Sequence, residues 1–563
     1  MRWTLKPKPD PIKVANFSKE LGVENSTANL LVQRGIETFQ EAKDFFRPDL
    51  SKIHNPFLMK DMDKAVTRIQ RALENKENIL VYGDYDVDGT TSVALVSRFL
   101  KEKQDNIATY VPDREGEGYG ISFQGIDFAD DNNFSLVIAL DCGIKAIDKI
   151  EYANKKNIDF IICDHHTPGE TVPDAVAILN PEQVTCAYPY KELSGCGVGF
   201  KLIQALNEKE GKDITSITQY LDLVATSIAA DIVPMTGENR ILTYHGLKII
   251  NKSPSIGIKA LKGVIDKDEF NITDVVFMIA PRINAAGRLK HAKYAVELLI
   301  ENDYRKAVAM AKEIDEFNTT RKDLDKRITQ EALLQIEKKG LQNNYTTVVY
   351  DNNWHKGVIG IVASRLIETH YKPTIVFTKN DKYYTASARS VKGYNLYEAL
   401  GKCDDLLEKW GGHKYAAGLS LKPENLAAFI TRFEKTVKDS ISEELREPEI
   451  IIDSEIHISD INHKFYRIIE QMSPFGPGNM RPTFAAYGLR DNGFGKKVGV
   501  DKSHLKLSII TGTNQKAIDA IGFGMGHKFD LTSKVFKAAF TVDENHWNGY
   551  TSVQLKLKDV VED

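Results

Sequence analysis

The stretch ILVYGDYDVDGTT, residues 79–91, decides the fold because it joins a buried strand to a helix through a turn rich in carboxylates. Residues 79–82 predict a strand, since the run is short, apolar, partly β-branched and closed by Gly83. Residues 90–100 carry apolar side chains on one strip, which predicts a helix. Open α/β sheets place their functional crevice where a strand passes through such a turn into a helix.

Three carboxylates occupy alternate positions in the turn: Asp84, Asp86 and Asp88. In an extended backbone, residues two apart share a face, so we expect these side chains to point together beyond the strand. Crowded like charges repel, and a bound divalent cation compensates them. An EF-hand calcium loop would need a glutamate at its twelfth position, where counting from Asp84 gives Leu95, and a helix in front, where a strand is predicted. The pattern favours a catalytic metal site over a calcium loop or a solvated acidic turn.

Composition indicates a globular protein of several domains. With 563 residues, of which 42% are hydrophobic and 27% charged, the chain is too long for one core, and roughly three or four domains are expected. MRWTLKPKPD at the start lacks the apolar core of a signal peptide, and we expect no membrane-spanning segment. Five cysteines without zinc-type spacing suit reduced thiols in the cytoplasm. The net charge of −4 does not indicate nucleic-acid binding, but it leaves room for a local basic groove.

Residues 79–237 alternate strand-like and helix-like segments, which predicts a parallel doubly wound sheet. An Asp after a strand is often only a helix N-cap, but repetition favours a shared site, because the carboxyl ends of parallel strands converge on one crevice. Carboxylates with imidazoles suit Mn²⁺ or a similar divalent ion better than structural zinc. Three further predicted strands end in such groups: 136–140 in Asp141, 160–163 in Asp164, His165 and His166, and 224–230 in Asp231.

The rest of the chain predicts further bodies. Apolar residues at near-helical spacing predict one long charged helix, with an interruption near residues 318–320. A second α/β unit and then a small barrel of short strands follow. The predicted fold class is α/β, with two α/β lobes, a long helix between them and a small C-terminal β-barrel. The expected domains are an N-terminal helical region 1–73, a catalytic domain 74–300, a connecting helix 301–342, a second lobe 343–445 and a barrel domain 446–563.

Several cations are candidates for phosphate contacts. Arg282 and Arg288 bracket small residues in APRINAAGR, which would permit close approach to an anion, although a surface salt bridge is the usual fate of an arginine. Residues 411–418 form a glycine-rich loop with a cation. His355 is either a substrate contact or a helix cap, and the sequence leaves both open. In the barrel, Lys496, Lys497, Lys502, Lys506 and Phe494 are candidates for binding a single strand, or for guarding an edge strand.

The motifs DYDVDG, LDCG, DHH and AADIVP, in this order, resemble those of the DHH phosphoesterase superfamily. The flanking segments VPDREGEGYG, LSGCGVGFKL, APRINAAGR, WHKGVIGIVASRL, SARS and GGHKYAAG look like its bacterial single-strand-specific 5′ exonucleases. The resemblance covers most of the chain, and the ordered set is specific although each motif alone is weak. It implies a DHH domain, a DHHA1 domain and an OB-type domain.

This resemblance also implies roles for individual residues. Asp86, Asp88, Asp141, His165 and Asp231 match metal-binding positions, and Asp84 is an additional ligand or its close neighbour. Asp164 would orient the histidines and His166 would face the scissile phosphate, so these two are the expected catalytic residues beside two divalent cations, Mn²⁺ or Mg²⁺. The expected substrate-binding residues are Arg114, Arg282, Arg288, Ser387, Arg389, Gly411, Gly412 and His413.

The expected function is a metal-dependent, single-strand-specific DNA exonuclease that works 5′ to 3′ by a two-metal mechanism in DNA repair and recombination. The expected partner is single-stranded DNA, with a helicase or a single-strand-binding protein as candidates for delivering it, and we expect a cytoplasmic monomer. One alternative is a phosphodiesterase of the same superfamily that acts on short oligonucleotides or cyclic dinucleotides, which would not need the barrel. Another is a non-catalytic single-strand binder, which the intact Asp and His positions argue against.

Overall fold

β2 lies inside a five-stranded parallel sheet in the computed structural model of the chain, which describes residues 1–512, 517–547 and 549–563. The strand order is β3-β2-β4-β5-β6, and every neighbouring pair is parallel. All residues of β2 and β4 are buried, as expected of central strands with helices on both faces. The strands of this catalytic lobe are β2 (Ile79–Gly83), β3 (Ile107–Tyr110), β4 (Leu136–Leu140), β5 (Asp159–Cys163) and β6 (Ala177–Leu179).

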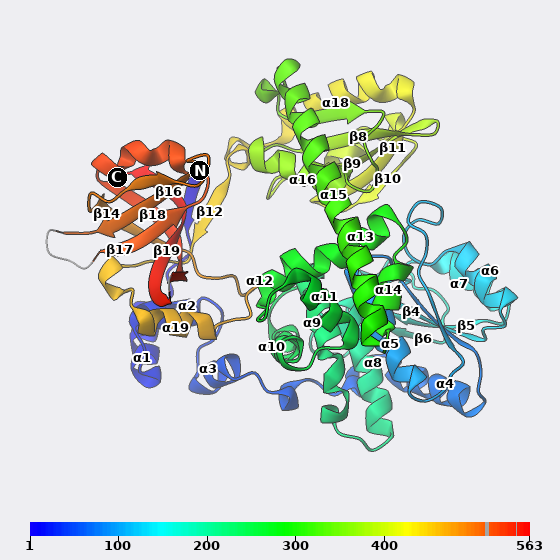
Figure 1. Cartoon of the computed structure of the whole chain (residues 1–563). Helices are drawn as coiled ribbons and strands as arrows, with labels where there is room; N and C mark the ends of the chain where they lie inside the picture. Colours follow the sequence, from blue (N-terminus) through cyan, green and yellow to red (C-terminus); the bar gives the residue numbers. More distant parts are fainter. Residues whose placement is uncertain (513–516, 548) are drawn as a thin grey trace.

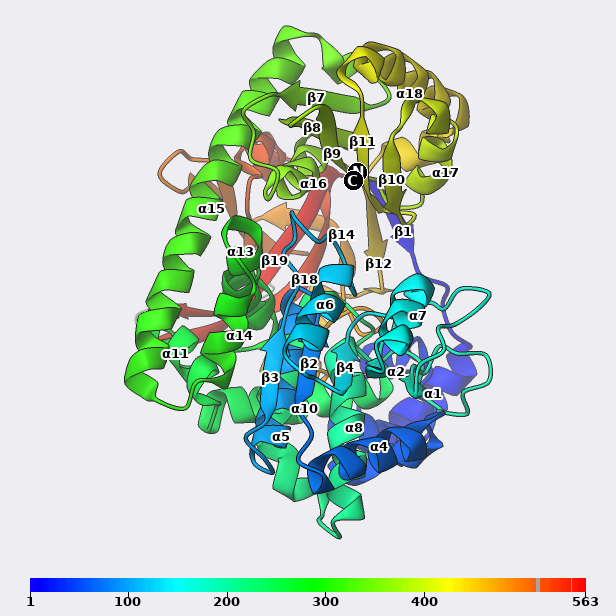
Figure 2. The same cartoon turned by 90° about the vertical axis from the view of Figure 1, so that its right-hand side faces the viewer.

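Helices cover both faces of this sheet. Alternate residues of β2 face opposite cores: Val81 packs with α4, α5 and α8, whereas Leu80 packs with α6 and α7 (Figure 2). The helices of this lobe are α4 (Met62–Glu74), α5 (Val87–Lys101), α6 (Phe123–Asp131), α7 (Ile147–Lys155), α8 (Gly195–Lys209), α9 (Leu221–Asp231), α10 (Gly237–Lys252), α11 (Ile256–Ile265), α12 (Ile272–Asp274), a π-helical turn η4 (Val275–Ile279), α13 (Ala280–Leu289) and α14 (Lys293–Ile300).

Two local predictions in this lobe are wrong. The turn after β2 is not extended, because Asp86 caps α5 by accepting a hydrogen bond from the Gly89 N–H at 3.0 Å. The helix therefore begins at Val87, and Asp88 lies in its first turn. The segment predicted to end as a strand at Asp231 is the helix α9. α9 is buried along almost its whole length, its few polar residues included, so no exposed polar face reveals its period and periodicity does not separate it from a buried strand.

A single long helix, α15 (Tyr304–Lys338), joins the catalytic lobe to the second lobe (Figures 1 and 2). It has 35 residues and runs through residues 318–320 without the predicted interruption. The second lobe has a five-stranded sheet of order β10-β11-β9-β8-β7. Its elements are β7 (Thr347–Asp351), α16 (Ile359–Thr369), β8 (Thr374–Asn380), β9 (Tyr383–Arg389), α17 (Leu396–Gly401), β10 (Lys409–Gly412), β11 (Ala416–Leu421) and α18 (Leu426–Ser440).

The third body is a β-barrel that stands apart from both lobes in Figure 1. An additional pairing between β14 and β16 closes its sheet of order β13-β14-β18-β19-β17-β16-β15. The predicted fold class, two α/β lobes joined by a long helix and followed by a barrel, is therefore confirmed. The elements are β12 (Glu449–Ile452), β13 (Ser454–Glu455), α19 (His463–Gln471), β14 (Phe484–Asp491), β15 (Lys496–Val498), β16 (His504–Ile510), β17 (Ile518–Gly522), β18 (Phe536–Trp547) and β19 (Tyr550–Glu562).

The N-terminal region is divided between two bodies. β1 (Arg2–Leu5), which the sequence did not predict, pairs in parallel with β12. α1 (Pro11–Leu21), α2 (Asn25–Val32) and α3 (Phe39–Phe46) pack on the barrel core, while α4 belongs to the catalytic lobe. Within the described ranges, none of the helices is both long and apolar enough to cross a bilayer.

Candidate active site

Three strand ends and one helix end meet at one edge of the catalytic sheet. Asp84 follows β2, Asp141 follows β4, and His165 follows β5 by one residue. α9 brings its last residue, Asp231, to the same place. Because parallel strands all end at one edge, the topology gathers these side chains from positions far apart in the sequence.

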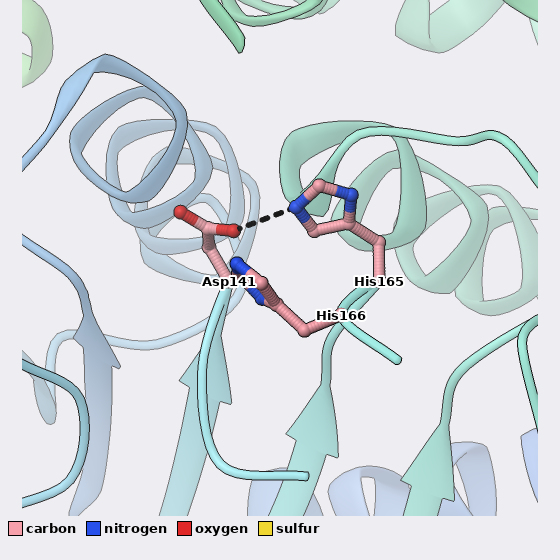
Figure 3. A group of neighbouring side chains, drawn as sticks. All are labelled: Asp141, His165 and His166. Atoms are coloured by element: carbon pink, nitrogen blue, oxygen red, sulfur yellow. Dashed lines mark ion pairs between the residues drawn. The ribbon is translucent and has the colours of Figure 1, made fainter. Parts of the chain in front are cut away.

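His165 is at the centre of the cluster. Its Nε2 lies 3.2 Å from Asp141 Oδ1, 3.6 Å from Asp231 Oδ2 and 3.7 Å from Asp88 Oδ2. Figure 3 shows the Asp141 carboxylate and both imidazoles turned toward one another. Ligand atoms of Asp88, His165 and Asp231 lie within 4.8 Å of one another, and so do those of Asp141, His165 and His166.

Two observations indicate that this cluster is built for cations. Asp141 Oδ1 and His165 Nε2 are buried, and neither has a hydrogen-bond partner among the described residues. Burial and the neighbouring carboxylates raise the pKa of Asp141 well above its usual range, and burial together with Asp88 and Asp86 raises the pKa of Asp231 to about 8. Crowded, buried carboxylates with a free imidazole nitrogen are the donor set that Mn²⁺ or Mg²⁺ takes.

The three aspartates of the first motif differ in their surroundings. Burial and the charge of Asp86 raise the pKa of Asp84 to about 8, and Asp84 Oδ1 accepts a long hydrogen bond, 3.4 Å, from the Gly120 N–H. Asp86 caps α5, as described above, and burial and Asp88 raise its pKa. Asp88 is held from outside its own motif, by N–H groups and a hydroxyl at 2.7 Å: Gly195, Cys196 and Ser227.

Those partners of Asp88 were missed by the sequence analysis. Gly195 and Cys196 lie in the first turn of α8, whose free N–H groups attract a carboxylate. The quoted motif LSGCGVGFKL contains them, and its Ser194, which caps α8, was the available signal. The helix thus fixes the orientation of Asp88 while one edge of the carboxylate still faces His165.

Asp164 and His166 form a hydrogen-bonded pair at 2.7 Å between Oδ1 and Nδ1. Asp164 also accepts hydrogen bonds from the backbone N–H groups of Ile144 and His165, so it fixes the turn that carries both histidines. Burial disfavours the imidazolium, but the hydrogen bond and charge of Asp164 outweigh it and raise the pKa of His166 to about 9. The Tyr119 hydroxyl, which the sequence analysis did not single out, lies 3.1 Å from His166 Nε2.

A second cluster, the arginine pocket, consists of Arg114, Arg288, Ser387 and Arg389 around the start of α16. Burial and then the charges of Arg114 and Arg389 lower the pKa of Arg288 to about 10. Arg389 donates to Ser387 Oγ at 3.1 Å. A Cβ added to Gly360, in the first turn of α16, would meet Ser387 Oγ at 2.9 Å and an Arg389 guanidinium nitrogen at 3.1 Å. Three neighbouring arginines beside a helix N-terminus concentrate positive charge and N–H donors, which favours binding of an anion.

Arg282 and the glycine-rich loop lie elsewhere. Arg282 Nε donates to Asp315 Oδ1 of α15 at 2.8 Å, and Gly287 lets α13 approach the Tyr85 carbonyl, since an added Cβ would meet that oxygen at 2.8 Å. The small residues of this motif, which were predicted to admit an anion, instead let α13 pack against the backbone at Tyr85. Gly411 and Gly412 lie in the edge strand β10 of the β10–β11 hairpin, opposite Gly418 and Ala417.

Two histidines of the second lobe have different surroundings. His413 lines a cleft of about 490 Å³ together with Tyr119, His165 and His166. His355 Nδ1 accepts a hydrogen bond from the Gly357 N–H at 3.0 Å, so it caps the turn that leads into α16.

Comparison with known proteins agrees with this geometry. Residues 78–228 match the DHH family N-terminal domain, 342–439 the DHHA1 domain and 452–559 the RecJ OB domain. The single-stranded-DNA-specific exonuclease RecJ of Bacillus subtilis is 35% identical over 99% of this chain and 70% of its own length. RecJ of Haemophilus influenzae is 32% identical over 97% of this chain and 98% of its own length.

A solved structure gives the same result at the level of the whole fold. Crystalline RecJ from Thermus thermophilus in complex with Mn²⁺ superposes with a TM-score of 0.84 and 27% identity, covering 100% of this chain and 80% of that chain. The matches run through both lobes and the barrel, in the same order along the chain. The chain belongs to the RecJ family of single-stranded-DNA-specific exonucleases.

Proposed function

We propose that this protein is a metal-dependent exonuclease that degrades single-stranded DNA from its 5′ end, in DNA repair and recombination. The observation that carries the proposal is the pair of sites on the two lobes: a buried carboxylate–histidine cluster and a pocket of three arginines. The first suits divalent cations, and the second suits a terminal phosphate.

Asp84, Asp86, Asp88, Asp141, His165 and Asp231 would hold two divalent cations, Mn²⁺ or Mg²⁺. When bound, the cations lower the pKa of a water molecule and neutralise charge that develops on the scissile phosphate. The free Asp141 Oδ1 and His165 Nε2 support this assignment. The N–H groups of α8 keep the Asp88 carboxylate in place, so it does not need to reorganise when a cation arrives.

His166 would donate a hydrogen bond to the scissile phosphate. Its Nδ1 lies 2.7 Å from Asp164 Oδ1, so this carboxylate keeps the ring in one orientation and leaves Nε2 to face the substrate. In the displacement, the water oxygen forms a bond to phosphorus while the bond from phosphorus to the 3′ oxygen of the terminal nucleotide breaks. The terminal nucleotide leaves with a 3′-hydroxyl, and the shortened strand keeps a new 5′-phosphate.

The arginine pocket would bind that 5′-phosphate. A terminal phosphate is a compact dianion, and Arg114, Arg288 and Arg389 supply positive charge with bidentate geometry. Ser387 and the start of α16 supply a hydroxyl and N–H donors. Because each cut creates a new 5′-phosphate, the same pocket serves every turnover, and the strand is degraded 5′ to 3′.

The barrel would collect the strand. Phe494 is 72% exposed, next to Lys496 and Lys497 on the edge strand β15, which offers a stacking ring with two cations. Lys506 is less available, because it lies 3.5 Å from Asp519. We infer a cytoplasmic monomer that receives its strand from a helicase or a single-strand-binding protein. The closed barrel also favours a long strand over the alternative of a short oligonucleotide or cyclic dinucleotide.

The test is a comparison of matched 5′-phosphate and 5′-hydroxyl single strands. Arg389→Ala should lower kcat/KM on the phosphorylated strand by about 1.5–3 kcal/mol, the range for a hydrogen bond to a charged group, and largely erase the preference. Lys392→Ala is the matched control, since this exposed cation pairs with Glu449 instead. Unchanged phosphate preference in Arg389→Ala would remove the pocket assignment, and degradation from the 3′ end or equal cleavage of duplex would overturn the proposed function.

A further inference from the structure

The arginine pocket has two walls that come from different lobes. Arg288 lies near the end of α13 in the catalytic lobe, and Gly360 lies in the first turn of α16 in the second lobe. The walls touch directly, since Arg288 donates a hydrogen bond to the Gly357 carbonyl at 3.1 Å. One hydrogen bond to a carbonyl does not fix the separation of two lobes, so the pocket depends on how each helix is held.

Both helices are fastened to α15 by ion pairs. On the catalytic side, Arg282 of α13 donates to Asp315 at 2.8 Å. On the other side, Arg365 of α16 donates to both oxygens of Asp325, at 2.9 and 2.8 Å. Asp315 and Asp325 are ten positions apart on one uninterrupted helix, which corresponds to about 15 Å along its axis.

The pair of Arg365 with Asp325, the Asp325 clamp, joins a buried carboxylate to a half-exposed arginine, since the Arg365 side chain is 48% exposed. Asp325 is 1% exposed, and Arg321, one turn earlier on α15, lies 3.9 Å from it and donates to Asn318 at 2.8 Å. A buried carboxylate shared by two arginines resists displacement, because breaking the ion pair would leave the Asp325 charge buried and unpaired. In the Arg282–Asp315 clamp it is the carboxylate that is less enclosed, with the Asp315 side chain 33% exposed and the Arg282 side chain 12% exposed.

We propose that the two ion pairs, Asp325 with Arg365 and Asp315 with Arg282, are made by positioning residues. They hold the arginine pocket at a set distance from the carboxylate cluster, because the rigid helix α15 fixes the distance between them. α13 also lies against the metal-binding turn, where Gly287 meets the Tyr85 carbonyl. The two clamps therefore connect the turn that carries Asp84 and Asp86, through α13, α15 and α16, to the residues that would bind the 5′-phosphate.

The consequence concerns how much DNA is removed in each cut, and it rests on the proposed function. If the terminal phosphate is held in the pocket, the distance to the carboxylate cluster decides which phosphate of the strand reaches it. A displacement of about 1 Å can cost about 100-fold in rate, so a fixed distance between the arginine pocket and the carboxylate cluster would select one product length. If this distance varies, more than one phosphate of the strand can reach the cluster. The higher kcat/KM on 5′-phosphorylated strands would then shrink.

The experiment compares Asp325→Asn and Asp315→Asn with wild type and with Arg327→Gln, an exposed residue of the same helix whose pair with Glu331 is 3.8 Å long. Product lengths are read on a labelled 5′-phosphorylated strand, kcat/KM is measured on phosphate and hydroxyl ends, and Mn²⁺ affinity is measured by calorimetry. We expect both variants to give a mixture of product lengths and to lose about tenfold or more in kcat/KM on phosphorylated ends. Losses on hydroxyl ends should be smaller, Mn²⁺ affinity should be unchanged, and Arg327→Gln should match wild type.

A folded Asp325→Asn protein with wild-type product lengths and phosphate preference would overturn the proposal, even if it melted at a lower temperature. If Asp325→Asn does not fold, the Asp315→Asn protein decides by the same measurements, since its carboxylate is less enclosed. Failure of the proposed function is distinguishable, because wild type itself would then show no preference for a 5′-phosphate.

Discussion

Asp141 combines burial, an unpartnered oxygen and a backbone φ of 59°, a conformation that residues with a Cβ rarely adopt. Such strain persists where the surroundings hold it, and it gathers at functional sites. Its backbone N–H donates to the Cys163 carbonyl at 2.8 Å, so the strained residue is tied to the neighbouring strand end that carries the histidines. The sequence motif LDCG names the residue but not this conformation.

We expect Asp141→Asn to lose more than about 100-fold in kcat/KM, because loss of a metal ligand should exceed the 10–100-fold cost typical of its supporting residues. Without metal, the variant should melt no lower than wild type, since it removes repulsion with Asp88 and Asp86. Calorimetric Mn²⁺ titration and melting curves in EDTA measure both effects. Asp405→Asn, an exposed carboxylate paired with Arg432 in the second lobe, is the control. Near wild-type turnover of Asp141→Asn in excess Mn²⁺ would refute the metal assignment.

The same carboxylates predict a pH dependence of the metal-free protein. The pKa values of Asp84 and Asp231 rise from an ordinary 3.8 to about 8 in the folded state. A group with a raised folded-state pKa contributes stability below its unfolded pKa, and this stability is lost as the pH rises through the folded pKa. In EDTA, Tm should therefore fall by a few degrees between about pH 6 and about pH 8.

With Mn²⁺ present the trend should reverse, because cation binding displaces the protons and is stronger at higher pH. Melting curves at both pH values, with EDTA and with Mn²⁺, separate the two cases. A Tm in EDTA that rises between these pH values would show that repulsion among the site carboxylates does not control stability in this range.

At the level of elements, the start of α16 is the part of the arginine pocket that depends on backbone. Its N-cap position, Val358, has no side-chain cap, and among the described residues the N–H groups of Ile359 and Gly360 have no hydrogen-bond partner, so these two can bind an anion. The glycine-rich motif predicts amide donors at Gly411 and Gly412, but the structure places both residues in a hairpin. In the segment WHKGVIG, Gly357 precedes the apolar helix and Gly360 lies in its first turn, and this pair was the signal for the helix N-terminus.

We expect Gly360→Ala to lower the preference for a 5′-phosphate by between about threefold and about tenfold, less than the loss of a whole charged hydrogen bond. The added Cβ would push on Ser387 and Arg389. Stability should change little, because the gain of about 0.5–1 kcal/mol for alanine over glycine in a helix offsets the cost of moving the Ser387 hydroxyl. Gly401→Ala, at the end of α17, is the control, since its nearest neighbour would be Trp410 at 3.7 Å. Equal kinetics for the two variants would show that α16 does not contact the end.

At the scale of the whole molecule, the N-terminal helices and the barrel form one body. Val14, Phe17, Leu30 and Leu31 are buried against the barrel core. Arg240 of the catalytic lobe donates to the carbonyls of Phe45, Met472, Ser473 and Pro474, so both segments of this body are bound to the lobe by one arginine. Removing one segment alone exposes the core of the other.

We therefore expect a fragment of residues 1–446 to aggregate, because the four apolar side chains above would face water and β1 would lose β12. A fragment of residues 48–446 should stay monodisperse. Size-exclusion chromatography with light scattering at matched concentrations measures this. Equal behaviour of the two fragments would mean that the N-terminal helices are an independent unit.

The second prediction at this scale concerns substrate length. Without the barrel body, the 48–446 fragment should bind long single strands far more weakly, while cleavage of very short strands should slow less. The log–log slope of affinity against salt should flatten by about 0.7 for each DNA phosphate that the fragment no longer neutralises. Titrations of strands of increasing length at several salt concentrations give both quantities. A parallel loss on short and long strands with an unchanged slope would place strand capture in the lobes.

The sequence by itself determined the fold class and the identity of the polar groups at the strand ends. Short β-branched runs closed by Gly or Asp, such as residues 79–83, report burial and backbone locally, and α15 shows its apolar residues at helical spacing. These patterns depend only on residues close together in the sequence, so they can be recognised before the tertiary structure is known. They fail for α9, because a helix buried on all sides has no polar face to reveal its period.

Only the tertiary structure decided which polar groups meet. Arg282 and Asp315 are 33 positions apart, and Asp88 receives its hydrogen bonds from residues more than 100 positions away. The same arginine, read from its neighbours, fits a phosphate or a salt bridge equally well. The choice depends on which helix packs beside it, and helix packing is set by the whole core rather than by any local pattern. For the same reason the N-terminal helices joined the barrel, since an amphipathic face shows that a helix must be covered but not by what.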